Sequence, residues 1–69
     1  MRLSARNQLE GTVVRVELGA VRSTVVIRLA GGQEVVSAIT KDSATALEIK
    51  EGDAVTAVIK ATEVMIGKD

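Results

Sequence analysis

The opening segment, residues 1–11, holds the side chains of this 69-residue chain that are best suited to bind a ligand. Ser4 has a hydroxyl group and Arg6 has a guanidinium group, and backbone N–H groups lie beside them. Such groups are donors or are rich in donors, which suits a tetrahedral oxyanion better than a cation. The segment therefore predicts an anion-binding site ahead of the first strand. A simpler interpretation is that Ser4 lies in an N-terminal coil and that Arg6 pairs with a surface carboxylate such as Glu10.

Residues for catalysis are missing from the chain. It has no His and no Cys, so it has neither an imidazole base nor a thiol nucleophile. A phosphate-binding loop, a dinucleotide-binding glycine pattern and a calcium loop are also absent. The glutamates occupy positions that we expect to face water: Glu10, Glu17, Glu34, Glu48, Glu51 and Glu63. We therefore expect a protein that is not an enzyme and has no site for a free metal cation.

The composition disfavours two classes of partner. Nine basic and nine acidic residues give a formal net charge of zero, and the chain has no Phe, Tyr or Trp. A nucleic-acid binder needs a positive surface, and small barrels that bind single strands also use aromatic rings for stacking. No apolar run approaches the roughly 20 residues that span a bilayer, and the start lacks the apolar core of a signal peptide. We expect a cytoplasmic protein with no nucleic-acid partner and no membrane partner.

Alternating apolar and polar residues predict a series of short strands. Gly31 and Gly32 favour a tight hairpin, because glycine accepts the positive φ of primed turns. Thr40 or Asp42 can cap a short helix that follows the third strand. The expected strands cover residues 12–18, 21–29, 34–40, 54–60 and 62–66. This order predicts an all-β fold, a single five-stranded OB-like β-barrel with one short helix between strands three and four.

Several of these strands carry apolar residues on both faces. In the first strand, alternation places Val14, Val16 and Leu18 on one face and Val13 on the other. One face fills the barrel, and burying each valine of the other face would favour association by about 1.5–3 kcal/mol. Single exposed valines are common on strands. Such two-sided apolar positions occur at four places in this small domain, and together they predict a homo-oligomer. They are Val13–Val14, Val25–Ile27, Val35–Val36 and Val58–Ile59.

Two segments of the chain resemble the Mop family of molybdate-binding proteins, the molbindins, whose domain is an OB fold of the TOBE or Mop type. The family's Ser-Ala-Arg-Asn-Gln opening appears as Ser4–Gln8. Its Ile-Lys-Ala-Ser/Thr-x-Val-Met-Ile ending appears as Ile59–Ile66. The resemblance covers almost the whole chain, and it implies that residues 1–69 form one Mop domain.

The resemblance also implies a set of molybdate-binding residues, namely Ser4, Ala5, Arg6, Lys60, Ala61 and Thr62. It implies that Lys60 contacts bound molybdate across a subunit boundary, whereas the sequence alone favours a lysine that extends to the surface. Asn7 and Gln8 are expected to fix the local backbone. A second type of anion site is also implied, and the turn formed by Gly19, Ala20 and Val21 is the candidate for it. A plain hairpin turn is the simpler interpretation of those three residues.

The function that the resemblance implies is noncovalent binding of molybdate, or of tungstate, for molybdenum storage or homeostasis in the cytoplasm. The sites would lie at subunit interfaces of a homo-oligomer, which in this family is a hexamer. The alternative is an accessory or regulatory module of molybdate transport or of molybdate-responsive gene control, because similar domains occur fused to transporter ATPases and to a DNA-binding repressor. An OB-type nucleic-acid binder is disfavoured by the zero net charge and the absence of aromatic residues.

Overall fold

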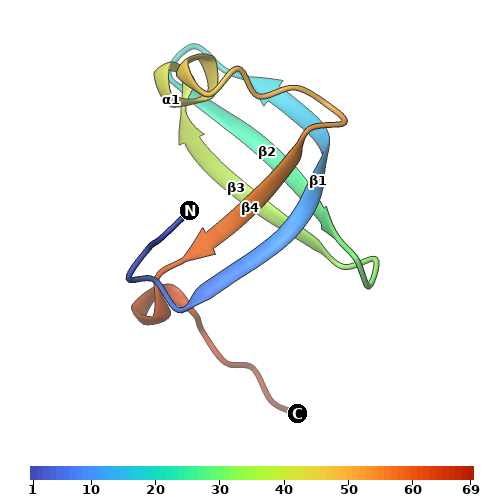
Figure 1. Cartoon of the computed structure of the whole chain (residues 1–69), viewed down its shortest axis with the longest axis vertical. Coiled ribbons are helices and arrows are strands. Elements are labelled where there is room, and N and C mark those ends of the chain that lie inside the picture. Colours follow the sequence, from blue (N-terminus) through green and yellow to red (C-terminus); the bar gives the residue numbers. More distant parts are fainter.

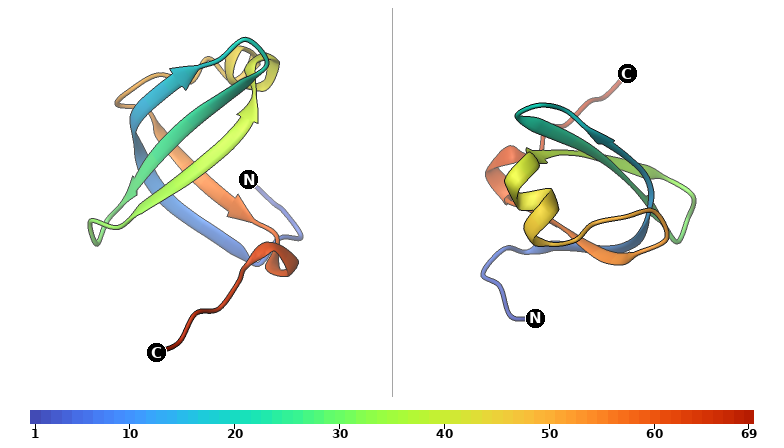
Figure 2. Two further views of the ribbon diagram at one scale, coloured as in Figure 1. Left: turned by 180° about the vertical axis from the view of Figure 1, so that it is seen from behind. Right: turned by 90° about the horizontal axis from the view of Figure 1, so that it is seen from above.

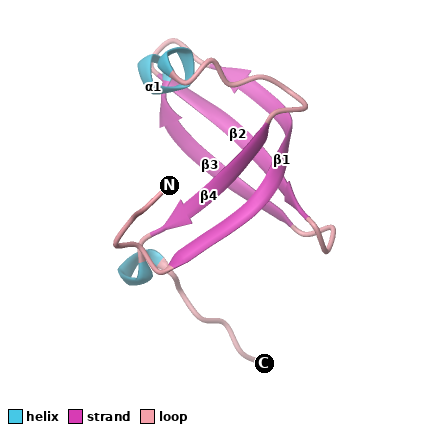
Figure 3. Ribbon diagram, viewed as in Figure 1, coloured by secondary structure: helices cyan, strands magenta, loops and turns pink.

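Four antiparallel strands, one short helix and one 3-10 turn make up the computed structural model, which describes all residues 1–69 (Figure 1, Figure 3). The strands lie in one curved sheet in the order β3-β2-β1-β4. Helix α1 and the 3-10 turn η1 lie at opposite ends of this sheet (Figure 3). The elements are β1 (Asn7–Leu18), β2 (Arg22–Leu29), β3 (Glu34–Thr40), α1 (Lys41–Ala46), β4 (Ala54–Ile59) and η1 (Ala61–Glu63).

Strand β1 is a central strand of the sheet and pairs with β2 on one side and with β4 on the other. It begins at Asn7, five residues earlier than the alternation pattern predicts. Gly11 lies where the strand packs tightly against β2. A Cβ atom at this position would lie 2.6 Å from Cγ2 of Ile27 and 2.7 Å from the carbonyl oxygen of Arg28. Glycine within a strand often marks such a close approach, and here it lets β1 bend around the core (Figure 1).

The two faces of β1 differ from the predicted alternation, because a β-bulge interrupts it. Val13 pairs with Ile27, but the next paired residue is Arg15, so Val14 is an extra residue in the ladder. The bulge puts Val13 and Val16, three positions apart, on the same face. Val13 is 1% exposed and belongs to the core with Val25, Ile27 and Ala57. The predicted grouping, with Val16 beside Val14 and Leu18 and Val13 on the opposite face, was therefore wrong, and Leu18 is exposed.

The barrel has four strands and is open, so the prediction of a closed five-stranded barrel was wrong in that respect. Strands β3 and β4 form the two edges of the sheet and are not paired with each other. Residues 62–66, the expected fifth strand, have no strand partner: residues 62–63 belong to η1, and residues 64–66 continue into an extended tail that leaves the body of the molecule (Figures 1 and 2). Their apolar, β-branched sequence favours a strand, but a strand needs a neighbour to supply its backbone hydrogen bonds.

The helix after the third strand is confirmed, as is its cap. The Thr40 hydroxyl oxygen accepts a hydrogen bond from the Ser43 backbone N–H at 3.0 Å. At the other end, the N–H groups of Glu48 and Ile49 donate back into the last turn of the helix. Glu48 closes this end with a φ of 53°, a position that glycine usually occupies. Buried Ala44 packs the helix over one end of the barrel.

The predicted hairpin at Gly31–Gly32 is confirmed, but its turn is not of the primed type, because Gly31 has no positive φ. The Leu29 N–H donates to the Gln33 carbonyl oxygen at 2.8 Å, and the Gly32 N–H donates to the Leu29 carbonyl oxygen at 2.9 Å. Gly32 has a φ of 91° and thus supplies the positive φ that the turn requires. No helix in the structure has the length and the apolar character that a membrane span requires.

Candidate functional site

The two sequence segments predicted to bind an anion meet at one end of the sheet. Asn7 and Ile59 are partners in the β1–β4 ladder. Ser4–Arg6 therefore lead into one strand at the point where Lys60–Thr62 leave its neighbour. Figures 1 and 2 show the N-terminal segment and η1 together at this end. Antiparallel pairing of the first strand with the last thus joins segments that lie more than 50 positions apart in the sequence.

The charged side chains at this end have no partners within the chain. Ser4, Arg6 and Lys60 are exposed. The ion pairs of the structure join Arg15 to Glu17 and Arg28 to Glu34, and both lie elsewhere in the sheet. The alternative pairing of Arg6 with Glu10 is not formed. Two cationic groups and a hydroxyl thus remain available to a ligand.

Backbone donors at the same place are also unused. Six N–H groups make no hydrogen bond to another part of the chain, and they belong to Ser4, Ala5, Arg6, Lys60, Ala61 and Thr62. In η1, the N–H groups of Glu63 and Val64 donate to the carbonyl oxygens of Lys60 and Ala61. The first N–H groups of a helical turn have no partner within it. Free N–H groups beside cationic side chains are the donor set that an oxyanion requires.

Two side-chain amides tie this end of the molecule together. The Asn7 Nδ2 group donates to the carbonyl oxygen of Ile59 at 3.2 Å. The Gln8 Nε2 group donates to the carbonyl oxygen of Ala5 at 2.8 Å. Asn7 and Ala5 are half-buried here, whereas most of their neighbours are exposed. The sequence suggested that Asn7 and Gln8 fix the local backbone. Gln8 holds a carbonyl group three residues before it, whereas the partner of Asn7 depends on the register of β1 with β4.

The turn predicted as a second anion site lies at the opposite end of β1. The Gly19 N–H donates to the Arg22 carbonyl oxygen at 2.8 Å, so the turn itself uses this donor. None of Gly19, Ala20 and Val21 has a positive φ, whereas an anion nest alternates right- and left-handed residues. The N–H groups of Ala20 and Val21 would be the donors if this turn binds an anion, and the site stays a prediction.

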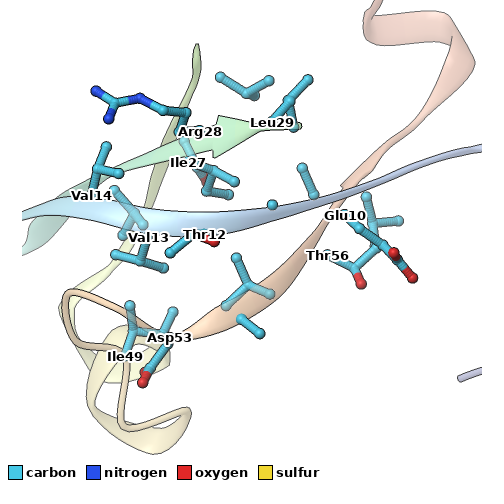
Figure 4. Close-up of a pocket in the computed structure, with 18 of the residues that line it drawn as sticks. Glu10, Thr12, Val13, Val14, Ile27, Arg28, Leu29, Ile49, Asp53 and Thr56 are labelled. Carbon is cyan, nitrogen blue, oxygen red and sulfur yellow. The ribbon is translucent and has the colours of Figure 1, made fainter. Parts of the chain in front are cut away.

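A large groove lies elsewhere in the molecule, where the sheet is left open between β3 and β4. It has a volume of about 1390 Å³ and is lined mostly by apolar residues. Figure 4 shows Val13, Ile27 and Ile49 along it, together with the carboxylates of Glu10 and Asp53. The basic side chain that lines the groove, Arg28, is paired with Glu34 at 2.6 Å, so apolar walls and two carboxylates offer little to an oxyanion. No group of three or more His, Cys, Asp or Glu residues in the structure could hold a metal ion.

The fold is that of a small OB-like, all-β domain, and one end of its sheet is rich in free hydrogen-bond donors. The family model that describes the TOBE domain matches residues 3–66, so the chain belongs to the TOBE domain family. Molybdenum-pterin-binding protein 3 of Clostridium pasteurianum is 54% identical over 66 residues, which cover 96% of this chain and 97% of that protein. The resemblance to the Mop proteins is therefore confirmed.

Solved structures agree with this assignment. MopII from Clostridium pasteurianum has a TM-score of 0.93 and 48% identity, and the match covers 97% of this chain and 100% of that one. The cytoplasmic molybdate-binding protein ModG, in a form with molybdate bound, has a TM-score of 0.84 and 49% identity. That match covers 88% of this chain and 43% of the ModG chain. The all-β, OB-like architecture with one small helix is thus shared with these proteins.

Proposed function

We propose that this protein binds molybdate, and tungstate in the same way, as a noncovalent oxyanion ligand. The observation that carries the proposal is the meeting of Ser4–Arg6 with Lys60–Thr62, where six backbone N–H groups and two cationic side chains have no partner in the chain. A relative supports the proposal, since the structure of ModG has been solved with molybdate bound. Residues Ser4, Ala5, Arg6, Lys60, Ala61 and Thr62 would supply the donors.

The chemistry of the ligand fits this donor set. Molybdate is a tetrahedral dianion with four equivalent oxygens, so it needs several converging donors and few acceptors. Hydrogen bonds from Arg6 or Lys60 to an anion are charge-assisted, and such bonds are roughly twice as strong as neutral ones. No carboxylate among the six proposed residues would repel the dianion. The chain also has no aromatic ring to stack on a pterin, which favours the oxyanion over a pterin-bound form of molybdenum as the ligand.

The proposal includes a homo-oligomer, a hexamer, with sites at subunit interfaces. One chain leaves the donors of the site open to solvent, so it cannot enclose a dianion by itself. It also leaves strand edges on β3 and β4 unpaired and exposes apolar residues, among them Val36 and the tail residues Val64, Met65 and Ile66. Exposed apolar residues and open strand edges favour association with another chain. A neighbouring chain would cover these surfaces and could bring its own donors to the ligand.

The biological role that we propose is molybdenum storage or homeostasis in the cytoplasm, without catalysis. ModG, which has a similar structure, is described as cytoplasmic. A binding role fits a chain that lacks the His and Cys residues of common catalytic sites. A role as an accessory or regulatory module of molybdate transport or gene control would use the same anion site and differs only in the protein that responds to the ligand.

Native mass spectrometry with and without molybdate tests the proposal. It reports the number of subunits and the number of bound anions in one measurement. Calorimetry should then show that molybdate and tungstate bind and that sulfate and phosphate bind much more weakly. A stable 7.2 kDa monomer would contradict the oligomer, and failure to bind molybdate or tungstate would contradict the function.

A further inference from the structure

We infer that Asn7 and Gln8 are a pair of positioning residues that aim two backbone donors, the N–H groups of Lys60 and Arg6, at the anion. This inference rests on the proposed function. Neither amide side chain is proposed to touch the ligand. Each one holds the carbonyl group of a peptide unit whose N–H group belongs to a residue of the proposed site.

Gln8 controls the peptide unit between Ala5 and Arg6. Its Nε2 group donates to the Ala5 carbonyl oxygen at 2.8 Å. The structure has no cis peptide bonds, so the Arg6 N–H points away from the Ala5 carbonyl. This contact is also the only hydrogen bond that joins any of residues 1–6 to the rest of the chain. Gln8 therefore fixes both the place of the opening segment and the direction of its last N–H group.

Asn7 does the same for the peptide unit between Ile59 and Lys60. Its Nδ2 group donates to the Ile59 carbonyl oxygen at 3.2 Å, across the last pair of the β1–β4 ladder. The Lys60 N–H makes no hydrogen bond within the chain and points away from that carbonyl. Two adjacent amides on β1 thus act on two different segments. One segment precedes the strand, and the other follows its neighbour.

The arrangement has an electrostatic consequence at the proposed site. A carbonyl oxygen carries partial negative charge and would repel a dianion, whereas an N–H group would attract it. Without the amide of Gln8, no hydrogen bond would hold the Ala5–Arg6 peptide unit in the orientation that keeps its carbonyl away from the ligand. Donors that are fixed before the ligand arrives bind more tightly, because the cost of ordering them has already been met. The hydrogen bonds of Asn7 and Gln8 should therefore raise the affinity for molybdate, although neither side chain contacts the anion.

Calorimetry with molybdate on Gln8→Met, which removes the donor and keeps the length of the side chain, tests this inference. Gln33→Met is the matched control, because Gln33 is the only other glutamine and its side chain makes no hydrogen bond. We expect Gln8→Met to weaken molybdate binding about three- to tenfold, the effect of one hydrogen bond. Gln33→Met should bind like the wild type. Gln8→Glu, which has no donor at neutral pH, should weaken binding at least as much.

A spectroscopic measurement separates positioning from a general structural role. In the amide NMR spectrum of the wild type, molybdate should shift the Arg6 and Lys60 N–H protons downfield. In Gln8→Met the Arg6 shift should shrink while the Lys60 shift remains, and Asn7→Leu should show the reverse. The melting temperature of ligand-free Gln8→Met should match that of the wild type, because the Gln8 side chain is exposed.

Three results would count against the inference or against its basis. Wild-type affinity and wild-type shifts in Gln8→Met would overturn the inference and leave the proposed function intact. A melting temperature that falls together with affinity would make the role of Gln8 structural and would also overturn it. Failure of the wild type to bind molybdate would overturn the proposed function itself.

Discussion

The side-chain amide of Asn7 donates to the carbonyl oxygen of Ile59 and so joins residues that lie 52 positions apart in the sequence. Asn7 begins β1 and Ile59 ends β4, so this contact lies where the first and last strands of the sheet meet. The proposed donors occupy the residues directly outside this pair. Their arrangement thus depends on the β1–β4 register, and ligand binding should be coupled to the stability of the sheet.

The first prediction follows from that coupling. Saturating molybdate should raise the melting temperature, because a ligand that binds only the folded state stabilises it by about 2.7 kcal/mol at 100 times its Kd. Tungstate should have a similar effect, and dialysis against ligand-free buffer should reverse it. Differential scanning calorimetry with sulfate at the same concentration is the control. Equal stabilisation by sulfate would show a general salt effect and no specific site.

The second prediction concerns Lys60. Lys60→Ala should leave the fold intact, since the side chain is exposed and makes no ion pair in the chain. It should weaken molybdate binding about ten- to a hundredfold, the range expected for a hydrogen bond to a charged group. Lys68→Ala in the C-terminal tail removes the same charge and is the matched control for calorimetry. If the two variants bind molybdate equally well, Lys60 is not part of the site.

The third prediction concerns the outer face of the sheet. Val36 pairs with Val26 across β2 and β3, but Val36 is 67% exposed whereas Val26 is 8% exposed. Val36→Asp should dissociate the oligomer without unfolding the chain, because a charge at an interface must lose its water. Val36→Thr keeps the shape of the side chain and should retain the assembly. Light scattering that gives the wild-type size for Val36→Asp would exclude this residue from the interface.

The sequence predicted the order of the elements but not two features that depend on strand neighbours. Residues 34–40 form a strand and Thr40 caps the helix, as their local chemistry predicts. The bulge at Val14 brings Val13 onto the same face as Val16, and alternation cannot reveal an extra residue in a ladder. The sequence of residues 62–66 predicts a strand, but no neighbouring strand of the chain pairs with them. Local patterns report propensity, and pairing decides whether a strand forms.

For the candidate site, too, the sequence predicted the residues but not the contacts that depend on strand pairing. The resemblance of Ser4–Gln8 and Ile59–Ile66 to the Mop proteins predicted the residues of the anion site. In the structure, strand pairing places the two segments side by side. The sequence could not show which backbone N–H groups stay free or which carbonyl groups the amides of Asn7 and Gln8 hold. Those facts depend on the register of β1 with β4 and on the path of the chain just outside that pair.

The fourth prediction tests the close approach of β1 to β2. Gly11→Ala should destabilise the fold by about 1–3 kcal/mol, the cost of inserting an atom into a well-packed place. The added Cβ would lie too close to the Ile27 side chain and the Arg28 backbone. Gly67→Ala is the control, because a Cβ there meets nothing within 4 Å. Chemical denaturation that gives both variants the same stability would show that β1 can move away from β2 without cost.

The last prediction separates an anion binder from a nucleic-acid module with a similar fold. At about 0.15 M salt, where screening acts within roughly 8 Å, fluorescence anisotropy should detect no binding of single- or double-stranded oligonucleotides. The chain has zero net charge and no aromatic residue, so it lacks both a phosphate track and a stacking platform. Molybdate binding should persist at that salt, because an enclosed dianion held by short hydrogen bonds is shielded from mobile ions. Tight oligonucleotide binding without molybdate binding would contradict the proposed function and favour a nucleic-acid role.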